Sequence, residues 1–387
     1  CLGALPAAMA AASEDRTLLC PYACGPEAAW VGTANVIAAR TLADVIRHYN
    51  GQSVIAPSRP GEVMQAAQAR DLSEVKGQER AKRAIEIAAA GRHHLLMVGS
   101  PGSGKSMLAA RIPGILPPLT PSEALETSMI HSVSGLLDEG GISRERPFRE
   151  PHHTASMAAI VGGGRGAKPG EISLTHNGVL FMDEFPEFPR TVLETLRQPI
   201  ETGEVVVARA NAHVKYPCRF MLVAAANPCK CGYLTDPARA CSRAPICGED
   251  YMGRISGPLM DRFDLRVEVP PVAFTDLDLP QDGESSEVVR DRVKMARAAQ
   301  ATRYADVTHV RVNADAEGKV LEDFATPDAE GRALLTRVAE RFGLSARGYH
   351  RVLRVARTIA DLDGEADVRQ PHVAEAVSYR LAMSKEV

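Results

Sequence analysis

The sequence predicts an α/β fold in which a mainly parallel sheet is flanked by helices and is followed by an all-α C-terminal domain. Two observations support this prediction. In residues 72–271, apolar runs of strand length alternate with stretches of helical periodicity, the pattern of a parallel sheet covered by helices. Residues 291–387 have helical periodicity throughout, as in "ARGYHRVLRVARTIADL". We expect an acidic linker over residues 272–290 to join these two units.

A smaller unit precedes them. Residues 1–56 are rich in alanine, and we expect a helix over residues 33–50 and a strand over residues 52–57. Prolines and a glycine then mark residues 57–71 as a linker. Because the chain begins at Cys1 rather than at a methionine, we expect it to be a fragment of a longer protein.

Composition and charge limit the possible functions. Of the 387 residues, 45% are hydrophobic and 24% are charged, and the formal net charge is −3. This balance excludes bulk positive charge as the means of holding nucleic acid, so such contact requires a local basic patch. No apolar run approaches the roughly 20 residues of a membrane span. We expect a cytoplasmic protein that does not contact the membrane.

The strongest motif is "GSPGSGKS" at residues 99–106, which fits the pattern GxxxxGK[ST]. The apolar run Leu95–Val98 precedes it and a helical pattern follows, so backbone N–H groups and a helix N-terminus would face one anion. Lys105 would reach the β- and γ-phosphates, and the Ser106 hydroxyl would bind Mg²⁺. A glycine-rich turn that binds nothing is the alternative. The other predicted phosphate-loop residues are Gly99, Pro101, Gly102, Ser103 and Gly104.

Two acids follow a second buried-strand run, Val179–Met182. They stand where open parallel sheets place their ligands, at the carboxyl end of a strand. Asp183 would complete the Mg²⁺ shell, and Glu184 would polarise the attacking water. An acidic pair of this kind is otherwise a solvated turn, but a phosphate-binding loop on the same sheet favours the catalytic interpretation.

A third strand pattern, "RFMLVAAAN", ends at Asn227. An amide at the tip of this strand can orient the hydrolytic water or sense the γ-phosphate.

Four of the eight cysteines follow within residues 229–247. They could supply four thiolates to a structural Zn²⁺. Their spacing departs from the paired CxxC pattern, so free and partly buried thiols are an equal alternative, whereas a disulfide suits a cytoplasmic ATPase poorly. The candidate ligands are Cys229, Cys231, Cys241 and Cys247.

Several long blocks together resemble one family, the magnesium-chelatase-like branch of the AAA+ ATPases. The resemblance extends from about residue 70 to the C-terminus. It implies an AAA+ P-loop domain over residues 72–271 and a helical lid over residues 291–387, with residues 1–56 as the remnant of a Lon-like domain without an identifiable protease pair. The blocks include "EPHHTASMAAIVGGG", "PGEISLTHNGVLFMDEFPEF", "LRQPIETGEVVVARA", "AAANPCKCGY" and "RISGPLMDRFDL".

The resemblance also implies roles around the nucleotide. Asn227 is similar to sensor 1, and Arg347 is similar to sensor 2, projected from the lid. Arg262, in "LMDRFD", is similar to the arginine finger that reaches a neighbouring subunit, and Arg254 competes with it for this role. The segment lying against adenine would contain Val75, Gly77 and Gln78.

Two insertions resemble loops that touch DNA phosphates in related ring helicases. "IVGGGRGAKPGEIS" is similar to the helix-2 insert and carries Arg165 and Lys168. "GEVVVARANAHVKYP" alternates as a hairpin does and is similar to the pre-sensor-1 hairpin, with Arg209 and Lys215 as its basic residues. The alternative is a surface loop and a structural hairpin. Adjacent histidines and a nearby arginine would either line the same channel or be structural: Arg149, His152 and His153.

The predicted function is a ring-forming, hexameric ATPase that uses ATP and Mg²⁺ to move along single-stranded or branched DNA. It would act as a helicase or branch-migration factor in the integration of incoming DNA during natural transformation. One alternative is the ATPase subunit of a magnesium chelatase, which remodels a partner so that Mg²⁺ enters a porphyrin. Another is a nucleotide-gated scaffold. ATPase assays with DNA or with a chelatase partner would separate them.

Overall fold

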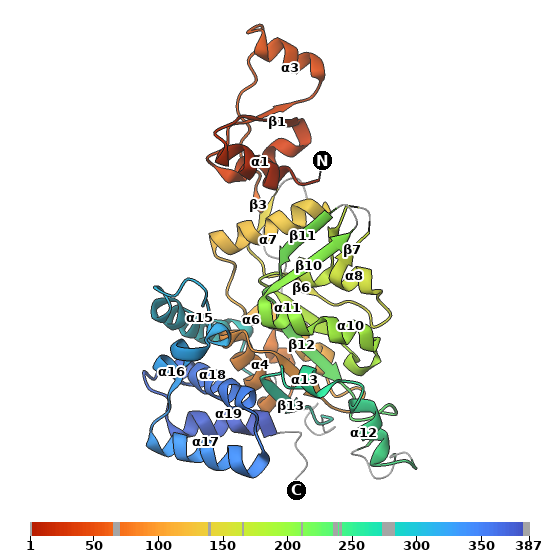
Figure 1. The fold of residues 1–387 in the computed structure, drawn as a ribbon, viewed down its shortest axis with the longest axis vertical. Coiled ribbons are helices and arrows are strands. Elements are labelled where there is room, and N and C mark those ends of the chain that lie inside the picture. The colour runs from red at the N-terminus through yellow and green to blue at the C-terminus, as the bar shows by residue number, and fades with distance from the viewer. Residues whose placement is uncertain are drawn as a thin grey trace.

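The computed structural model describes residues 2–64, 70–137, 141–164, 166–209, 212–234, 239, 242–272 and 283–381. Its α/β region lies in the middle of the molecule, with the helical C-terminal region packed against it and the N-terminal region projecting at one end (Figure 1). The predicted fold class, an α/β domain followed by an all-α domain, is therefore confirmed.

A five-stranded parallel sheet forms the centre of the α/β region. Every pair of neighbouring strands is parallel, and Leu95 is aligned with Val223 on one side and with Leu265 on the other. A parallel sheet is covered on both faces, and its strands are accordingly almost wholly apolar. The strand order is β13 (Leu265–Glu268), β4 (Leu95–Val98), β12 (Met221–Ala226), β9 (Val179–Met182) and β6 (Phe148–Arg149).

Alternate strand residues enter two different cores. Leu95 and Met97 pack in the larger core, with α4 (Glu79–Gly91) and helices of the C-terminal region. Leu96 and Val98 face the other core, where the chain between β9 and β12 covers the sheet. Successive side chains of a strand point to opposite faces, so one apolar run serves both cores.

The remaining elements of the α/β region are short, apart from α7. Its helices are α5 (Lys105–Ala109), α6 (Ile112–Ile115), α7 (Pro121–Ser134), α8 (Met157–Val161), α9 (Glu171–Leu174), α10 (Arg190–Thr195), α11 (Arg197–Thr202), α12 (Ile246–Met252) and α13 (Gly257–Met260). Outside the central sheet, the strands are β3 (Val63–Met64), β5 (Ile142–Ser143), β7 (Gly162–Gly163), β8 (Lys168–Pro169), β10 (Glu204–Arg209) and β11 (Ala212–Pro217), and the 3-10 turns are η3 (Leu72–Glu74) and η4 (Phe185–Glu187).

The C-terminal region is helical throughout its described part. Its first helix begins at Ser286, within the residues expected to form the acidic linker, and the Ser286 hydroxyl accepts a hydrogen bond from the Leu72 amide at 2.7 Å. Because α15 and α18 both contact α4, this region shares the larger core with the sheet. Its elements are α15 (Ser286–Arg303), η5 (Asn313–Asp315), α16 (Gly318–Ala325), α17 (Ala329–Phe342), α18 (Ala346–Leu362) and α19 (Gln370–Leu381).

The N-terminal region differs from the sequence prediction. Residues 33–50 do not form one helix, because Val36–Ala39 is a strand that pairs in parallel with Leu18–Pro21, and the helix starts only after Thr41, whose side chain caps it. Residues 52–57 are not a strand. The elements are α1 (Ala4–Ser13), β1 (Leu18–Pro21), η1 (Tyr22–Cys24), α2 (Gly25–Ala28), η2 (Ala29–Val31), β2 (Val36–Ala39) and α3 (Leu42–Tyr49).

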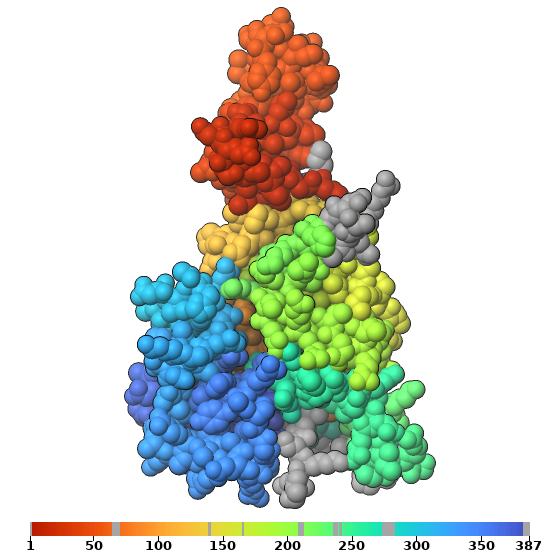
Figure 2. All heavy atoms as spheres, viewed as in Figure 1, coloured from red at the N-terminus to blue at the C-terminus, as the bar shows by residue number. Residues whose placement is uncertain are grey.

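This region rests on α7. The Gly3 amide donates to the Ser132 carbonyl oxygen at 3.2 Å, and the buried Glu27 carboxylate accepts from the Ser132 hydroxyl. The Trp30 side chain also packs against a small core that includes Leu119 and Ile142. Figure 2 shows the part around α3 projecting from the rest of the molecule. None of the described helices is both long and apolar enough to cross a membrane.

Candidate active site

The phosphate-binding motif forms the turn between β4 and α5. Two of its glycines adopt positive φ angles, 78° at Gly102 and 94° at Gly104, where a side chain would be strained. At Gly99, a Cβ atom would collide with the Val269 carbonyl oxygen. The glycines therefore shape a loop that directs its backbone toward the N-terminus of α5.

Lys105 folds back onto this loop. Its Nζ donates to the carbonyl oxygens of Gly99 at 2.8 Å and Ser100 at 2.9 Å, and to Oδ1 of Asn227 at 3.2 Å. Burial lowers the pKa of Lys105, although the nearby carboxylates of Asp183 and Glu184 oppose this effect. The predicted sensor 1 residue and the predicted phosphate-binding lysine are thus in direct contact.

The loop fits the phosphates of a nucleotide. Within the described part of this loop, the Ser103 hydroxyl is buried without a hydrogen-bond partner. A buried polar group without a partner is costly, so a ligand that supplies an acceptor is favoured. The donor set, made of backbone amides, a hydroxyl and an ammonium group, is the one that binds phosphate.

Ser106 and the acidic pair meet at the edge of the sheet. The Ser106 hydroxyl donates to Oδ2 of Asp183 at 2.6 Å, and Oδ1 of Asp183 accepts from the Glu184 amide at 2.8 Å. Hydroxyl and carboxylate oxygens beside a phosphate loop are the ligands that Mg²⁺ uses. Glu184 has a left-handed backbone, with φ of 49°, and its side chain is 49% exposed.

A histidine that the sequence did not assign to the site contacts Glu184. The Nδ1 atom of His153 lies 3.1 Å from Oε2 of Glu184. The ring of its neighbour His152 contacts the Thr154 hydroxyl and packs on the His153 ring, with centroids 4.2 Å apart. Arg149 forms a bidentate ion pair with Glu171. One feature of the sequence could have indicated this contact: His153 lies four residues after β6, the strand that pairs with β9.

The segment predicted to lie against adenine is next to the phosphate loop. Val75 is buried, and Gly77 and Gln78 both have positive φ angles, of 62° and 63°. The Gln78 amide donates to the Ser103 carbonyl oxygen at 3.4 Å and to the Pro270 carbonyl oxygen at 2.5 Å. The side chain therefore bridges the loop and the end of β13.

The two predicted arginines lie at the other edge of the sheet. Arg262 shortly precedes β13, and the Asp264 amide donates to the His94 carbonyl oxygen at 3.0 Å, just before β4 begins. The phosphate loop, in contrast, follows the carboxyl end of β4. Because β4 and β13 are parallel, Arg262 is separated from Lys105 by the length of the sheet.

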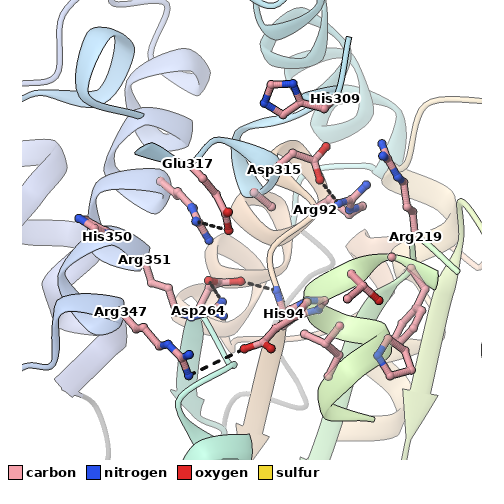
Figure 3. A pocket seen from close by; sticks show the side chains of 18 of the residues that line it. Arg92, His94, Arg219, Asp264, His309, Asp315, Glu317, Arg347, His350 and Arg351 are labelled. Atoms are coloured by element: carbon pink, nitrogen blue, oxygen red, sulfur yellow. Dashed lines mark hydrogen bonds and ion pairs between the residues drawn. The ribbon is translucent and has the colours of Figure 1, made fainter. Parts of the chain in front are cut away.

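Arg347 lies close to Arg262. Both guanidinium groups contact the Glu201 carboxylate, and the Arg347 distance is 3.9 Å. A cavity of about 640 Å³ opens here, between the amino ends of the strands and α18. Figure 3 shows Arg347 and Arg351 entering it from α18, with His94 and Asp264 on the strand side. Its basic residues include Arg92, Arg219, Arg347, Arg351 and Arg354.

Arg254, the other candidate for the arginine finger, does not lie with Arg262 and Arg347. Its Nη1 lies 2.9 Å from a carboxylate oxygen of Glu187, in η4, which follows the carboxyl end of β9. It therefore lies near the acidic pair and not with Arg262.

The two predicted DNA loops lie side by side. The β10–β11 hairpin forms as expected, with Arg209 aligned with Ala212 beside its turn and Lys215 paired with Glu204 at 2.5 Å. Gly162 and Gly163 pair with Pro169 and Lys168 in a second, shorter hairpin. The Tyr216 hydroxyl donates to the Ala167 carbonyl oxygen at 2.9 Å and so joins the two. Lys168 is exposed, and Arg165 lies outside the described residues.

The zinc hypothesis is not supported. Within the described ranges, no group of three or more histidines, cysteines and acids is placed to hold a metal ion. Cys229 is buried, with its sulfur 3.0 Å from that of Cys231, but Cys247 does not complete a site with them. Cys241 lies outside the described residues. A Cβ atom at Gly232 would collide with Pro101, so this segment packs on the phosphate loop.

Together, the parallel sheet, its phosphate loop, the acidic pair and the helical region define an ATPase of the magnesium-chelatase-like AAA+ type, which implies ATP and Mg²⁺ as cofactors. The chain belongs to the magnesium chelatase subunit ChlI family: the family's sequence pattern matches residues 71–277, and the pattern for the ChlI C-terminal region matches residues 283–380.

The chain is also similar to several named proteins of this kind. The chain is 44% identical to competence protein ComM of Haemophilus influenzae, over 98% of this chain and 74% of that protein. It is 41% identical to the uncharacterized protein YifB of Escherichia coli K12, over 98% of this chain and 74% of YifB. Identity to the magnesium-chelatase 38 kDa subunit of Rhodobacter capsulatus is 26%, over 80% of this chain and 87% of that subunit.

Proposed function

We propose that this chain is one subunit of a hexameric ring in which two neighbouring copies share each nucleotide. The observation that supports this proposal is the separation of Lys105 from Arg262 and Arg347, which lie at opposite edges of one sheet. Neither arginine reaches the phosphate loop of its own subunit. A second copy that presents its arginine edge to this loop would complete the site.

Each of the site residues has a separate role in the proposed hydrolysis of ATP. When bound, ATP with Mg²⁺ supplies the γ-phosphate that is transferred to water. Lys105 and the loop amides bind the phosphates, Ser106 and Asp183 hold the metal ion, and Glu184 orients and polarises the water. Asn227 senses the same phosphate through its contact with Lys105. Arg262 and Arg347 of the next subunit stabilise the charge that develops on the phosphate.

DNA is the proposed substrate of the motor. A ring gathers the exposed Lys168 and Lys215 of every subunit near one axis, with Arg165 and Arg209 on the same two loops, which compensates for the net charge of −3. The name of the ComM relative refers to competence. We propose an ATP-driven helicase or branch-migration factor that promotes the integration of incoming DNA in the cytoplasm during natural transformation.

The test of the shared site uses mixed subunits. Arg262→Ala should bind ATP normally and hydrolyse it much more slowly, since an arginine finger is worth about 10³ to 10⁵ in rate. Lys105→Ala should not bind ATP. Mixing the two should restore part of the activity, because some interfaces then combine an intact Lys105 with an intact Arg262.

A matched mixture provides the control. Arg262→Ala mixed with a Lys105→Ala/Arg262→Ala double variant contains no intact arginine, so its activity should stay at the level of Arg262→Ala alone. A rate for Arg262→Ala within about threefold of wild type would reject the shared site, given the size of a finger effect.

The chelatase relatives support a second candidate, an ATPase subunit that remodels a partner for Mg²⁺ insertion into a porphyrin. ATPase rates measured with single-stranded DNA, branched DNA and a chelatase partner distinguish the two. Stimulation by DNA supports the motor, and stimulation by the chelatase partner alone supports the second candidate.

A further inference from the structure

One carboxylate engages both arginines of the proposed shared site. Oε1 of Glu201 contacts Nη2 of Arg262 and lies 3.9 Å from Nη1 of Arg347. The two arginines belong to different regions, one to the segment before β13 and the other to α18. Glu201 therefore contacts one arginine of the α/β region and one arginine of the helical region.

Each nitrogen of the Arg262 guanidinium group has an acceptor in this arrangement. Its Nε donates to the Arg197 carbonyl oxygen at 3.3 Å, its Nη1 donates to the Pro258 carbonyl oxygen, and its Nη2 pairs with Glu201. Its side chain is only 6% exposed. A guanidinium group has more N–H donors than these three bonds use, but a side chain that is buried to this extent has to move away from these acceptors before it can bind a phosphate on a neighbouring copy.

Glu201 also belongs to the helix that leads into the larger of the two loops proposed to contact DNA. It lies on α11, and after Gly203 the chain enters β10. The Cys218 amide donates to the Gly203 carbonyl oxygen at 2.7 Å and closes the base of the β10–β11 hairpin. The hairpin is therefore joined through Gly203 to α11, which carries both Glu201 and the Arg197 carbonyl oxygen, so a displacement of the hairpin would move this helix.

We propose that Glu201 is a positioning residue that withholds Arg262 from the neighbouring subunit until the hairpin engages DNA. This inference rests on the proposed function. A carboxylate and a phosphate compete for the same edge of a guanidinium group, so Glu201 occupies the position that the phosphate needs. The Glu201 side chain is 46% exposed, and a solvated ion pair of this kind exchanges readily. DNA bound to the hairpin moves α11, frees Arg262 and raises the rate of hydrolysis.

The experiment is ATP hydrolysis by Glu201→Gln, with and without single-stranded DNA. The rate without DNA should rise several-fold, about fivefold or more if the coupling is of ordinary allosteric size, and the stimulation by DNA should shrink accordingly. Glu317→Gln is the matched control, because Glu317 pairs with Arg354 at 3.1 Å and the substitution removes a similar charge. It should leave both rates unchanged. An unchanged stimulation ratio in Glu201→Gln would overturn the proposal, as would a fall in its rate without DNA.

The gain must depend on Arg262 and must act across the interface. Adding Arg262→Ala to Glu201→Gln should remove the gain. A Lys105→Ala/Glu201→Gln subunit, which cannot use ATP itself, should raise the rate of wild-type subunits mixed with it more than a Lys105→Ala subunit does. A gain that persists without Arg262, or that is absent from the mixture, contradicts the proposal.

These measurements also distinguish a failure of the proposed role of Glu201 from a failure of the proposed shared site. If Arg262→Ala alone hydrolyses ATP at the wild-type rate, the shared site is wrong. If Arg262→Ala is inactive and Glu201→Gln behaves like wild type, only the role of Glu201 is wrong. Thermal denaturation checks that each variant folds. Glu201→Asp, which shortens the side chain and keeps the charge, provides a second variant with the same expected direction.

Discussion

The imidazole of His153 lies against the carboxylate of Glu184, with Nδ1 3.1 Å from Oε2. His153 follows β6, and Glu184 follows β9, the neighbouring strand. The His153 ring also stands edge-on to Phe188, with centroids 6.4 Å apart, and packs on the His152 ring, with centroids 4.2 Å apart. The Glu184 side chain is 49% exposed, and the contact with His153 restricts the orientation of its carboxylate.

His153→Ala should lower the turnover rate of ATP hydrolysis without changing ATP affinity. A carboxylate released from its partner spends less time facing the water, and we expect a loss of about tenfold, below the hundredfold cost of a fully misplaced catalytic group. Glu184→Gln should bind ATP and lose hydrolysis almost completely, which sets the lower limit. Steady-state kinetics with a separate nucleotide-binding titration measures both effects.

His152→Ala is the control for this series. Its ring contacts Thr154 and packs on the His153 ring, but it does not contact Glu184, so His152→Ala should lower the turnover rate less than His153→Ala does. Equal losses in the two histidine variants would show that the segment acts through folding and not through the His153 contact.

Charge reversal in the two hairpins tests the DNA interface. Lys168→Glu combined with Arg209→Glu should abolish the stimulation of ATPase by DNA and leave the basal rate nearly intact. Wild-type binding should weaken steeply as salt increases, because neutralised phosphates release counterions, and the double variant should show a shallower slope. Fluorescence anisotropy at several salt concentrations measures this slope.

Two exposed basic residues of the helical region, Lys319 and Arg332, provide a control with the same change in net charge. Their reversal to glutamate should leave the DNA response unchanged. If both double variants respond to DNA as wild type does, the hairpins are not the DNA interface.

His94 makes stability depend on pH. It is partly buried just before β4, and its Nδ1 accepts the Leu222 amide proton at 3.0 Å, which requires a neutral ring. Burial lowers the pKa of His94 to about 3, against the opposing effect of Asp264. In the unfolded chain a histidine has a pKa of about 6.5. As pH falls below about 6.5, the unfolded state binds a proton that the folded state excludes, and the free energy of unfolding decreases.

His94→Gln keeps a hydrogen-bond acceptor but does not titrate, so it should flatten the decrease between about pH 6.5 and pH 4. One group contributes at most about 1.4 kcal/mol for each pH unit. Urea denaturation over this pH range measures the slope. His350→Gln, at an exposed position of α18, should retain the wild-type slope. An equal slope in His94→Gln would mean that other groups cause the acid sensitivity.

The central strands and the nucleotide loop were predictable from the sequence. Leu95–Val98 and Val179–Met182 are wholly buried strands, and a strand covered on both faces is recognised as a continuous apolar run. The phosphate loop is equally local, since its glycines, Lys105 and Ser106 all lie within residues 99–106. The N-terminal region was predicted less well, because Val36–Ala39 becomes a strand only by pairing with Leu18–Pro21, which local periodicity does not reveal.

Only the tertiary structure decided how the charged residues meet. The sequence alone indicated Arg262 and Arg347 as separate candidates, but their common contact with Glu201 depends on the packing of α18 against the amino ends of the strands. The contact of His153 with Glu184 likewise follows from the pairing of β6 with β9. Such contacts join residues far apart in the chain, and they depend on strand order and on the packing of helices over the sheet. A local pattern carries no information about strand order or helix packing. The sequence alone therefore predicted the phosphate-binding motif but not the carboxylate that contacts both arginines.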